Sequence, residues 1–492
     1  MKKIKLFTVL ILIIVFLLSL SLVSCNKQKD ESSTKEQTST SSFDSDGLHG
    51  CFPVKFSSKK DVLRDWEGKT LNVLATRYEK NPTAPWGQLE LNPYSFGTGI
   101  GKAYDERQAK IKELYGVEID WISSQSYQFI AHDLATAEKS EALYYDIAIP
   151  RVTEAQALVS SVYNMRLSDY LSFENDYFSV SAYEDAFTNY GYTLFISGDH
   201  DFSTKLGSYA LIFNKKMLKQ KAPEIDIYNE VKNGTWTYDK FKSIASLVST
   251  DGEGDLGTYG VGISDITSYY YSFGIYEVDI DPDTGTYRYA FGIDKERLDS
   301  VIAIMKEAKG SLWTRDTWAN NSIMDTAFVD GRLMFYNGIV QKIDELKSNF
   351  DIGVVPFPKL NAEQTSYITP LDVKTTVLCI PRVTQDRQMS EYFIDVLSWT
   401  GKEYTVKAYY DSLKESFNEE TANEDMQILQ NYVFKNIKYD VGYLTGGSIC
   451  GEMKQYILLQ PDDTTDWLAP VEIVQSWNNA WVNYDGDKEY FN

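Results

Sequence analysis

The sequence has 492 residues, of which 43% are hydrophobic and 14% aromatic, and its formal net charge is −22. Such an acidic surface repels nucleic acid and anionic lipid, so the composition excludes nucleic-acid binding and a basic membrane-binding patch. Roughly 440 residues remain after an N-terminal stretch with almost nothing to bury, and that length suits two lobes of ordinary domain size.

Residues 1–24 predict a secretory signal. Three lysines open the chain, and Leu6–Val23 is almost wholly apolar. The end of this run, Leu22–Cys25, resembles the bacterial lipobox, which implies that Cys25 becomes the new N-terminus and carries lipid. The alternative is an uncleaved membrane helix, since the apolar run approaches the roughly 20 residues that span a bilayer.

Residues 25–59 predict a lipid-anchored, disordered tether, because serine, threonine and charged residues dominate them and few apolar groups are available for burial. After Cys25 only three cysteines remain, an odd number that forbids complete pairing. A disulfide between Cys51 and Cys450 is left open. Cys379 lies in an apolar run and is interpreted as a buried small hydrophobe.

Strands and helices alternate from residue 69 onward. A helix carries Tyr104 and Ile111 at helical spacing and stops at Gly116, and another begins near Thr153. Alternation of this kind indicates βαβ units with a parallel sheet, and therefore an α/β fold. The strands expected around these helices are Lys69–Thr76, Val117–Ser123 and Tyr145–Pro150.

A polar loop separates two apolar, β-prone runs, Tyr192–Ser197 and Ser208–Asn214. The loop contains Asp199, His200 and Asp201, followed by an aromatic residue. Binding groups usually sit on loops held by rigid strands, and this mixture suits a polar ligand with one apolar face, such as a sugar. The alternative is an acidic surface hairpin.

The second half of the chain repeats the alternation with other lengths. Trp236 precedes a helix for which Thr237 is the expected N-cap, and Leu298 begins the apolar stripe of a later helix. From Met389 onward the chain is expected to be mostly helical. The expected strands are Tyr259–Ser264, Leu333–Asn337, Asp351–Pro358 and Thr375–Ile380.

Motifs for chemistry are sparse. Gly97–Lys102 resembles a phosphate loop but lacks two required residues, so it is interpreted as a flexible loop before the helix at Tyr104. Asp251, Glu253 and Asp255 offer alternate oxygen ligands for calcium, with an acidic turn as the alternative. The chain has three histidines and no HExxH motif, and we expect no cofactor and no catalytic residue. A secreted glycosidase with paired carboxylates stays open as the rival.

Five stretches together resemble the sugar-binding family of extracellular solute-binding proteins of ABC transporters, the family that includes maltose-binding protein. The resemblance covers nearly all of residues 60–415, and the order and spacing of the stretches behind a lipobox make it specific. They are Tyr209–Leu218 (YALIFNKKML), Trp236–Phe241 (WTYDKF), Asp251–Gly260 (DGEGDLGTYG), Phe328–Phe335 (FVDGRLMF) and Asp351–Pro358 (DIGVVPFP).

This resemblance implies a two-lobed, periplasmic-binding-protein-like fold with a hinge and an interlobe cleft. Crossings between the lobes are placed near Ser208, Leu371 and Leu413. Lobe one is expected to comprise residues 60–207 plus 372–413, and lobe two 208–371 plus 414–492. The ligand contacts it implies are Arg77, Tyr78, Arg151, Asp199, His200, Asp201, Tyr269, Tyr271, Asn337 and Asp372, with Trp236 either stacking on the ligand or only capping its helix.

The function implied by the resemblance is that of a lipid-anchored receptor on the extracellular face of the cell membrane. It would be a monomer that captures a carbohydrate, with an oligosaccharide as the expected ligand, and delivers it to ABC permease subunits. The membrane contact would come through the lipid alone. The alternatives are the same fold binding another solute, such as a peptide, and a lipid-anchored enzyme that acts on glycosides.

Overall fold

The computed structural model divides the chain into two units, Met1–Gly47 and Leu48–Asn492, and every described residue lies in the second unit. No helix within this described part is both long and apolar enough to cross a membrane. The described residues are 66–76, 89, 91–124, 130–140, 142–160, 164–165, 167, 176–178, 187–189, 192–248, 257–263, 267–290, 293–311, 314–316, 321–346, 348–373, 375–442, 472 and 474–479.

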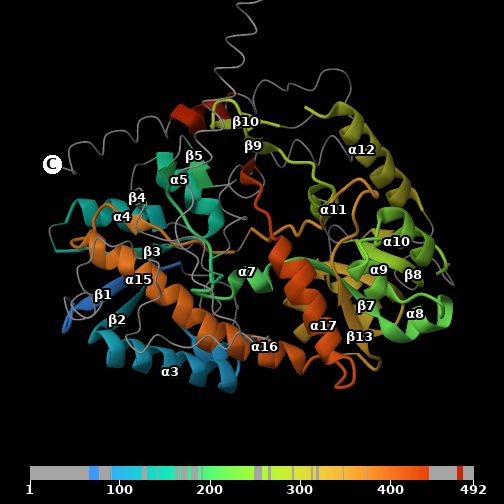
Figure 1. Ribbon diagram of the computed structural model, residues 1–492, viewed down its shortest axis with the longest axis horizontal. Coiled ribbons are helices and arrows are strands. Elements are labelled where there is room, and N and C mark those ends of the chain that lie inside the picture. The colour runs from blue at the N-terminus through green and yellow to red at the C-terminus, as the bar shows by residue number, and fades with distance from the viewer. Residues whose placement is uncertain are drawn as a thin grey trace, which may run out of the picture. The chain divides into compact units, whose positions relative to one another are not determined.

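The first sheet is parallel, with strand order β2-β1-β3. Its strands are β1 (Thr70–Ala75), β2 (Glu118–Ser123) and β3 (Ile147–Ile149), and all three match strands expected from the sequence. Alternating apolar residues put Leu71 and Val73 wholly in the core. Figure 1 shows this sheet beside helix α3 (Thr98–Tyr115), which connects β1 to β2.

Helix α3 ends as the sequence predicts. Gly116 takes the left-handed conformation (φ 66°), and its N–H donates to the carbonyl of Lys112. The start of the helix differs from the prediction, because α3 begins at Thr98. The glycine-rich stretch expected as a flexible loop is therefore mostly the first turn of this helix, and Tyr94 packs closely over Gly101.

The second sheet is mixed, with strand order β11-β8-β12-β7-β13. β8 runs parallel to β11 and β12, whereas β7 runs antiparallel to β12 and β13. Its strands are β7 (Tyr209–Asn214), β8 (Tyr259–Ile263), β11 (Thr314–Asp316), β12 (Leu333–Ile339) and β13 (Ile352–Val355). Four of them confirm expected strands; β11 had not been predicted.

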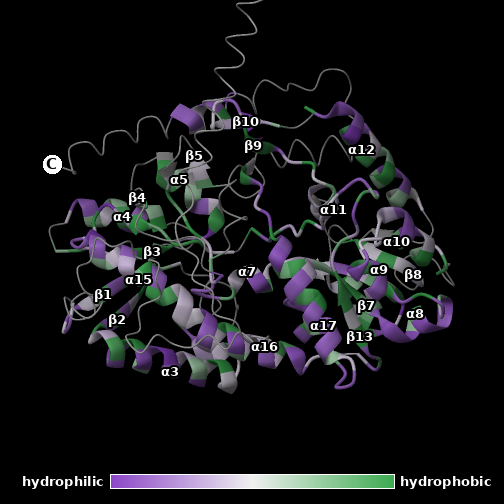
Figure 2. Cartoon of the chain, in the orientation of Figure 1, coloured by the Kyte–Doolittle hydropathy of each residue, from purple (hydrophilic) through white to green (hydrophobic). Residues whose placement is uncertain are grey.

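The helices around this second sheet are amphipathic. Helix α10 (Tyr238–Ala245) buries Phe241 and Ile244, and Thr237 occupies its N-cap position, although its side chain makes no capping hydrogen bond. Figure 2 shows hydrophilic residues along α8 (Lys215–Lys221) and α12 (Lys295–Gly310), whereas strand β7 is apolar from Ala210 to Phe213. This sheet therefore has a core on each of its faces.

Two segments meet where the sequence places crossings between the lobes. Ser208 pairs with Leu371 in an antiparallel bridge, and the N–H of Asp372 donates to the carbonyl of Gly207. Most of the predicted strand Thr375–Ile380 forms isolated bridges, which join Thr376 to Arg151, Leu378 to Ile196 and Cys379 to Ala148, and its last residue begins the short strand β14. The boundaries of the two lobes stay a prediction.

From Arg387 onward the described chain is mostly helical, as expected. Helix α15 (Arg387–Thr400) continues through a π-helical segment, Gly401–Val406, into α16 (Lys407–Lys414). The remaining elements are the helices α4 (Ile130–Glu138), α5 (Ala155–Ser160), α7 (Ser203–Leu206), α9 (Ile227–Lys232), α11 (Thr267–Ser272), α13 (Asn321–Val329), α14 (Lys342–Glu345) and α17 (Ala422–Ile428), the 3₁₀ turns Pro93–Phe96, Val152–Glu154 and Phe434–Asn436, the π-helical segment Leu429–Val433, and the strands β4 (Asn164–Met165), β5 (Thr188–Asn189), β6 (Tyr192–Thr193), β9 (Val278–Ile280), β10 (Tyr287–Tyr289) and β14 (Ile380–Pro381).

Candidate functional site

Polar side chains are buried where the three parallel strands of the first sheet end. Thr76 follows β1, Ser124 follows β2 and Arg151 follows β3, and each is at most 5% exposed. The hydroxyl of Ser124 donates to Asp133 on α4. The carboxyl ends of parallel strands are where α/β sheets bind ligands, and Arg151 was predicted on this basis.

Glu154 lies beside Arg151 and is also buried. Its Oε2 accepts the backbone N–H of Ile130, the first residue of α4, at 2.6 Å. Burial raises the pKa of Glu154 to about 7, although that hydrogen bond and the Arg151 charge oppose the shift. This carboxyl group therefore changes charge near neutral pH.

The predicted loop Asp199–Asp201 is neither an exposed hairpin nor open to solvent. Asp199 forms a buried ion pair with Lys205. Burial lowers the pKa of Lys205, but Asp199, Tyr410 and Asp201 together raise it by more. Asp201 Oδ1 accepts the N–H of Ser203 at 2.8 Å, and its Oδ2 accepts the hydroxyl of Thr376. Both carboxylates are thus occupied by partners within the chain.

His200 lies between these two carboxylates and is 1% exposed. Neither of its ring nitrogens has a hydrogen-bond partner among the described residues, and Nε2 is 3.6 Å from Asp201 Oδ2. Burial lowers the pKa of His200, and the charges of Arg107 and Lys205 act in the same direction. The imidazole is therefore neutral at pH 7.

Three residues predicted to contact ligand belong to the core of the second sheet. Trp236 is fully buried, and its indole N–H donates to the carbonyl of Pro356 at 2.9 Å, so the ring is not available for stacking. Tyr269 packs edge-on against Phe357. Asn337 is fully buried and donates to the hydroxyl of Ser268 at 3.0 Å.

A small hollow beside the Ser208–Leu371 bridge combines aromatic and charged groups. The Lys438 ammonium lies 5.0 Å from the centre of the Tyr276 ring, and both side chains are half-buried. Asp440 accepts the N–H of Glu277, and Tyr271, which was predicted as a contact, donates its hydroxyl to Glu277 at 3.1 Å. The hollow is lined by Tyr271, Tyr276, Ile368, Pro370, Leu371, Lys438 and Asp440.

This hollow measures about 10 Å³, room for about one water molecule. A larger ligand would therefore require the segment around Leu371 to separate from the segment around Lys438. Asp372, which was predicted as a ligand contact, follows Leu371 in the crossing and is half-buried.

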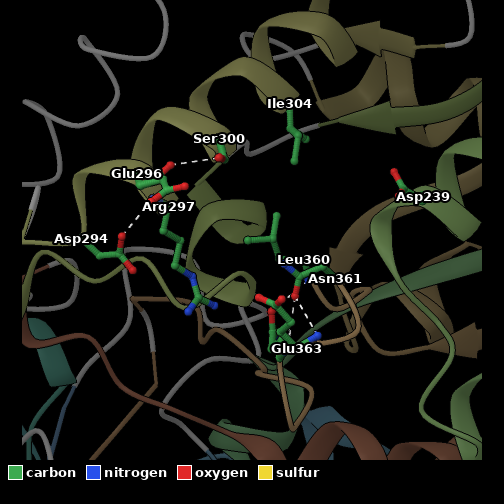
Figure 3. Close-up of a pocket in the computed structure, with 10 residues that line it drawn as sticks. Asp239, Asp294, Glu296, Arg297, Ser300, Ile304, Leu360, Asn361 and Glu363 are labelled. Carbon is green, nitrogen blue, oxygen red and sulfur yellow. Dashed lines mark hydrogen bonds between the residues drawn. The ribbon is translucent and has the colours of Figure 1, made fainter.

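A larger hollow of about 540 Å³ lies between α12 and the loop that carries Leu360 and Glu363 (Figure 3). Figure 3 shows Arg297 pointing toward the loop that carries Glu363, and the guanidinium of Arg297 donates to the carbonyl of Phe273. No aromatic ring is among the described residues that line it, so it offers no stacking surface for a sugar. The lining residues are Asp239, Asp294, Glu296, Arg297, Ser300, Ile304, Leu360, Asn361, Glu363 and Gln364.

Several predicted residues lie outside the described part of the chain. They are the contacts Arg77 and Tyr78, the lipid attachment residue Cys25, and the calcium candidates Asp251, Glu253 and Asp255. Among the described residues no group of three or more acidic, histidine or cysteine side chains could hold a metal ion.

Sequence reasoning missed Glu154, Tyr276, Lys438 and Asp440. Glu154 could have been noticed because it follows Arg151 at the end of a predicted strand. No local pattern marks Lys438 or Asp440, since they reach the crossing only through the fold of the C-terminal third.

No protein-family model matches the sequence, and no curated protein sequence matches it. Among solved structures, the chain is similar to MalE, a sugar-binding protein from the phytopathogen Xanthomonas citri, with a TM-score of 0.52 and 10% identity over 86% of this chain and 100% of that chain. UspC from M. tuberculosis gives 0.51 and 13% identity, over 84% of this chain and 100% of that chain. The apo-form of RafE from Streptococcus pneumoniae gives 0.50 and 13%, over 85% and 98%. These similarities show that the chain has the two-lobed α/β fold of maltose-binding-like proteins.

Proposed function

We propose that this protein is an extracellular solute-binding protein, anchored by lipid at Cys25, that binds a carbohydrate and delivers it to an ABC transporter. The observation that carries the proposal is the fold shared with the sugar-binding protein MalE over 86% of the chain. The five sequence stretches that resemble the same family support it independently.

The ligand contacts we propose come from both sides of the Ser208–Leu371 crossing. On one side, Arg151 lies at the carboxyl end of the parallel sheet. On the other, Tyr276 supplies a half-buried ring, with Lys438 and Asp440 as neighbouring polar groups. A ring with adjacent charged groups suits the apolar face and hydroxyls of a sugar, as in other aromatic-lined sites.

Calorimetric titration of the lipid-free protein with a binding oligosaccharide tests this site. We expect Tyr276→Ala to weaken binding at least about tenfold, which corresponds to 1.4 kcal/mol. Tyr94→Ala is the matched control, because Tyr94 is 51% exposed on a different element. Equal affinities for both variants would remove Tyr276 from the site.

The anchor is tested separately. We expect the full-length protein, expressed in a bacterium that processes lipoproteins, to incorporate labelled palmitate and to sediment with membranes. Cys25→Ala should abolish incorporation, whereas the variant Cys379→Ala, which removes a buried cysteine, should not. Labelling of Cys25→Ala would contradict the anchor.

A further inference from the structure

The two segments that form the crossing are joined by a small polar network. Thr376 donates its hydroxyl to Asp201, and the hydroxyls of Ser203 and Thr376 lie 2.8 Å apart. The N–H of Thr376 also donates to the hydroxyl of Ser203 at 3.1 Å. Asp201 and Thr376 therefore link the first crossing segment, Asp199–Ser208, to the second, Leu371–Thr376.

His200 lies next to this link without taking part in it. Its Nε2 is 3.6 Å from Oδ2 of Asp201, the oxygen that accepts the hydroxyl of Thr376. A buried imidazole with no hydrogen bond leaves its donor and acceptor unsatisfied, which destabilises the folded protein. A movement of less than about 1 Å would bring Nε2 within hydrogen-bonding distance.

The loop has little freedom to move elsewhere. A Cβ atom on Gly401 would come within 1.8 Å of the carbonyl oxygen of Asp199, so the π-helical segment lies directly on the loop. The fully buried Arg107 of α3 fixes the end of α15, which leads into this segment. Its guanidinium donates to the carbonyl of Leu397 and to the hydroxyl of Thr400. Within the described residues, both ring nitrogens of His200 lack a hydrogen-bond partner in this packing.

We propose that His200 is a proton-sensitive switch in the crossing. Its imidazole and the hydroxyl of Thr376 compete for Oδ2 of Asp201. When His200 takes up a proton from solvent, its imidazolium donates a hydrogen bond to Oδ2 and displaces the hydroxyl of Thr376. The link between the two crossing segments is then loosened. The proposal rests on the proposed function for its purpose, which is control of lobe movement, but its chemistry requires no ligand.

The charged and titratable groups around His200 come from four parts of the chain. Asp199, Asp201 and Lys205 belong to its own segment, and Arg107 belongs to α3. Tyr410 of α16 interacts with Lys205 and Asp199, and Tyr439 interacts with Asp201. The two carboxylates favour the imidazolium, while burial, Arg107 and Lys205 oppose it. The net effect is that the pKa of His200 lies below the ordinary value for histidine.

Nuclear magnetic resonance of ¹³C-labelled histidine tests the competition. The chain has three histidines, so the variant His49→Gln/His132→Gln leaves His200 as the only signal. In that background we expect Thr376→Val to raise the pKa of His200 by at least about one unit, because Asp201 loses its competing donor. Thr369→Val is the matched control, since Thr369 is equally buried and does not contact Asp201. Equal titration in the two variants would overturn the proposal.

Hydrogen exchange tests the loosened link. The amides of Tyr209 and Asp372, which donate to Pro370 and Gly207, report on the crossing. After correction for intrinsic rates, we expect protection to fall at least about tenfold between pH 7 and pH 5 in the parent protein, but not in His200→Gln. If His200→Gln fails to fold, His200→Asn is measured in its place. Unchanged protection in the parent, or equal loss in both proteins, would contradict the switch, whatever the outcome of sugar binding.

Discussion

Ser208 and Leu371 face each other in an antiparallel bridge, and on either side of it the chain enters a different sheet. β7 of the mixed sheet follows Ser208. The segment after Leu371 instead runs along the parallel sheet, where Thr376 pairs with Arg151 just after β3 and Cys379 pairs with Ala148 within β3. The contacts around this bridge therefore determine how the two sheets are joined.

The first prediction concerns the contribution of the ion pair between Asp199 and Lys205 to stability. Both side chains are about nine-tenths buried. Breaking a buried pair leaves an uncompensated charge, so we expect Lys205→Met to lower the free energy of unfolding by about 3–5 kcal/mol in urea titrations. Lys402→Met, which breaks an exposed pair with Asp176, should cost less than about 1 kcal/mol. Similar losses for both would contradict a buried pair.

Asp425 anchors α17 to the second sheet. It is fully buried and accepts hydrogen bonds from Lys215 and Tyr228 and a weak one from the N–H of Val354. We expect Asp425→Ala to cost about 3–5 kcal/mol, because the Lys215 ammonium loses its partner.

The neighbouring residue provides the control for that prediction. Glu424 pairs with Lys232 at the surface, so Glu424→Ala should cost less than about 1 kcal/mol by the same chemical denaturation. If the two variants were equally stable, Asp425 would not be an anchor.

Glu154 predicts a pH dependence of stability. Because its pKa is raised to about 7 in the folded protein, the folded state binds more protons than the unfolded state between pH 4.5 and pH 7. This contribution to stability, about 3 kcal/mol, is present below pH 4.5 and is lost as the pH rises through about 7. We expect Glu154→Gln to flatten this slope in thermal unfolding.

His200 predicts a slope of the opposite sign. Its lowered pKa means that the unfolded state binds the proton more tightly, so stability falls as the pH drops below the ordinary histidine value of about 6.5. His200→Gln should reduce this acid loss, and His132→Gln on α4 is its control. The same acid slope in all three proteins would show that another group is responsible.

Trp236 separates a core role from a binding role. Because the ring is fully buried and hydrogen-bonded, we expect Trp236→Ala to cost about 3–5 kcal/mol of stability. The folded fraction should bind sugar with unchanged affinity in calorimetry. A large loss of affinity with little loss of stability would restore the stacking hypothesis.

Much of the fold could be predicted from the sequence, because its signals are local. The alternation of Leu71 and Val73, the glycine that ends α3 and the apolar run of β7 each follow from neighbouring residues. The start of α3 was misplaced because its first turn contains two glycines, which have low helix propensity, and one of them, Gly101, packs closely against Tyr94.

The candidate site could not be predicted to the same extent, because burial there depends on distant segments. Asp199 and Asp201 resemble an exposed acidic loop until the π-helical segment at Gly401 covers them. Tyr269 follows β8 as predicted, whereas Asn337 lies within β12 because that strand continues to Ile339, and both side chains are buried. Arg151 lies at the predicted strand end, and its role as a contact stays a proposal.

A thermal-shift screen of the lipid-free protein against mono- and oligosaccharides, with peptides as the comparison, tests the central claim most directly. A ligand at 100 times its Kd adds about 2.7 kcal/mol of apparent stability, enough to raise the melting temperature measurably. We predict a shift with one class of oligosaccharide and recovery of that sugar intact. A shift with peptides alone would contradict the carbohydrate, and recovery of cleaved sugar would contradict a binding protein.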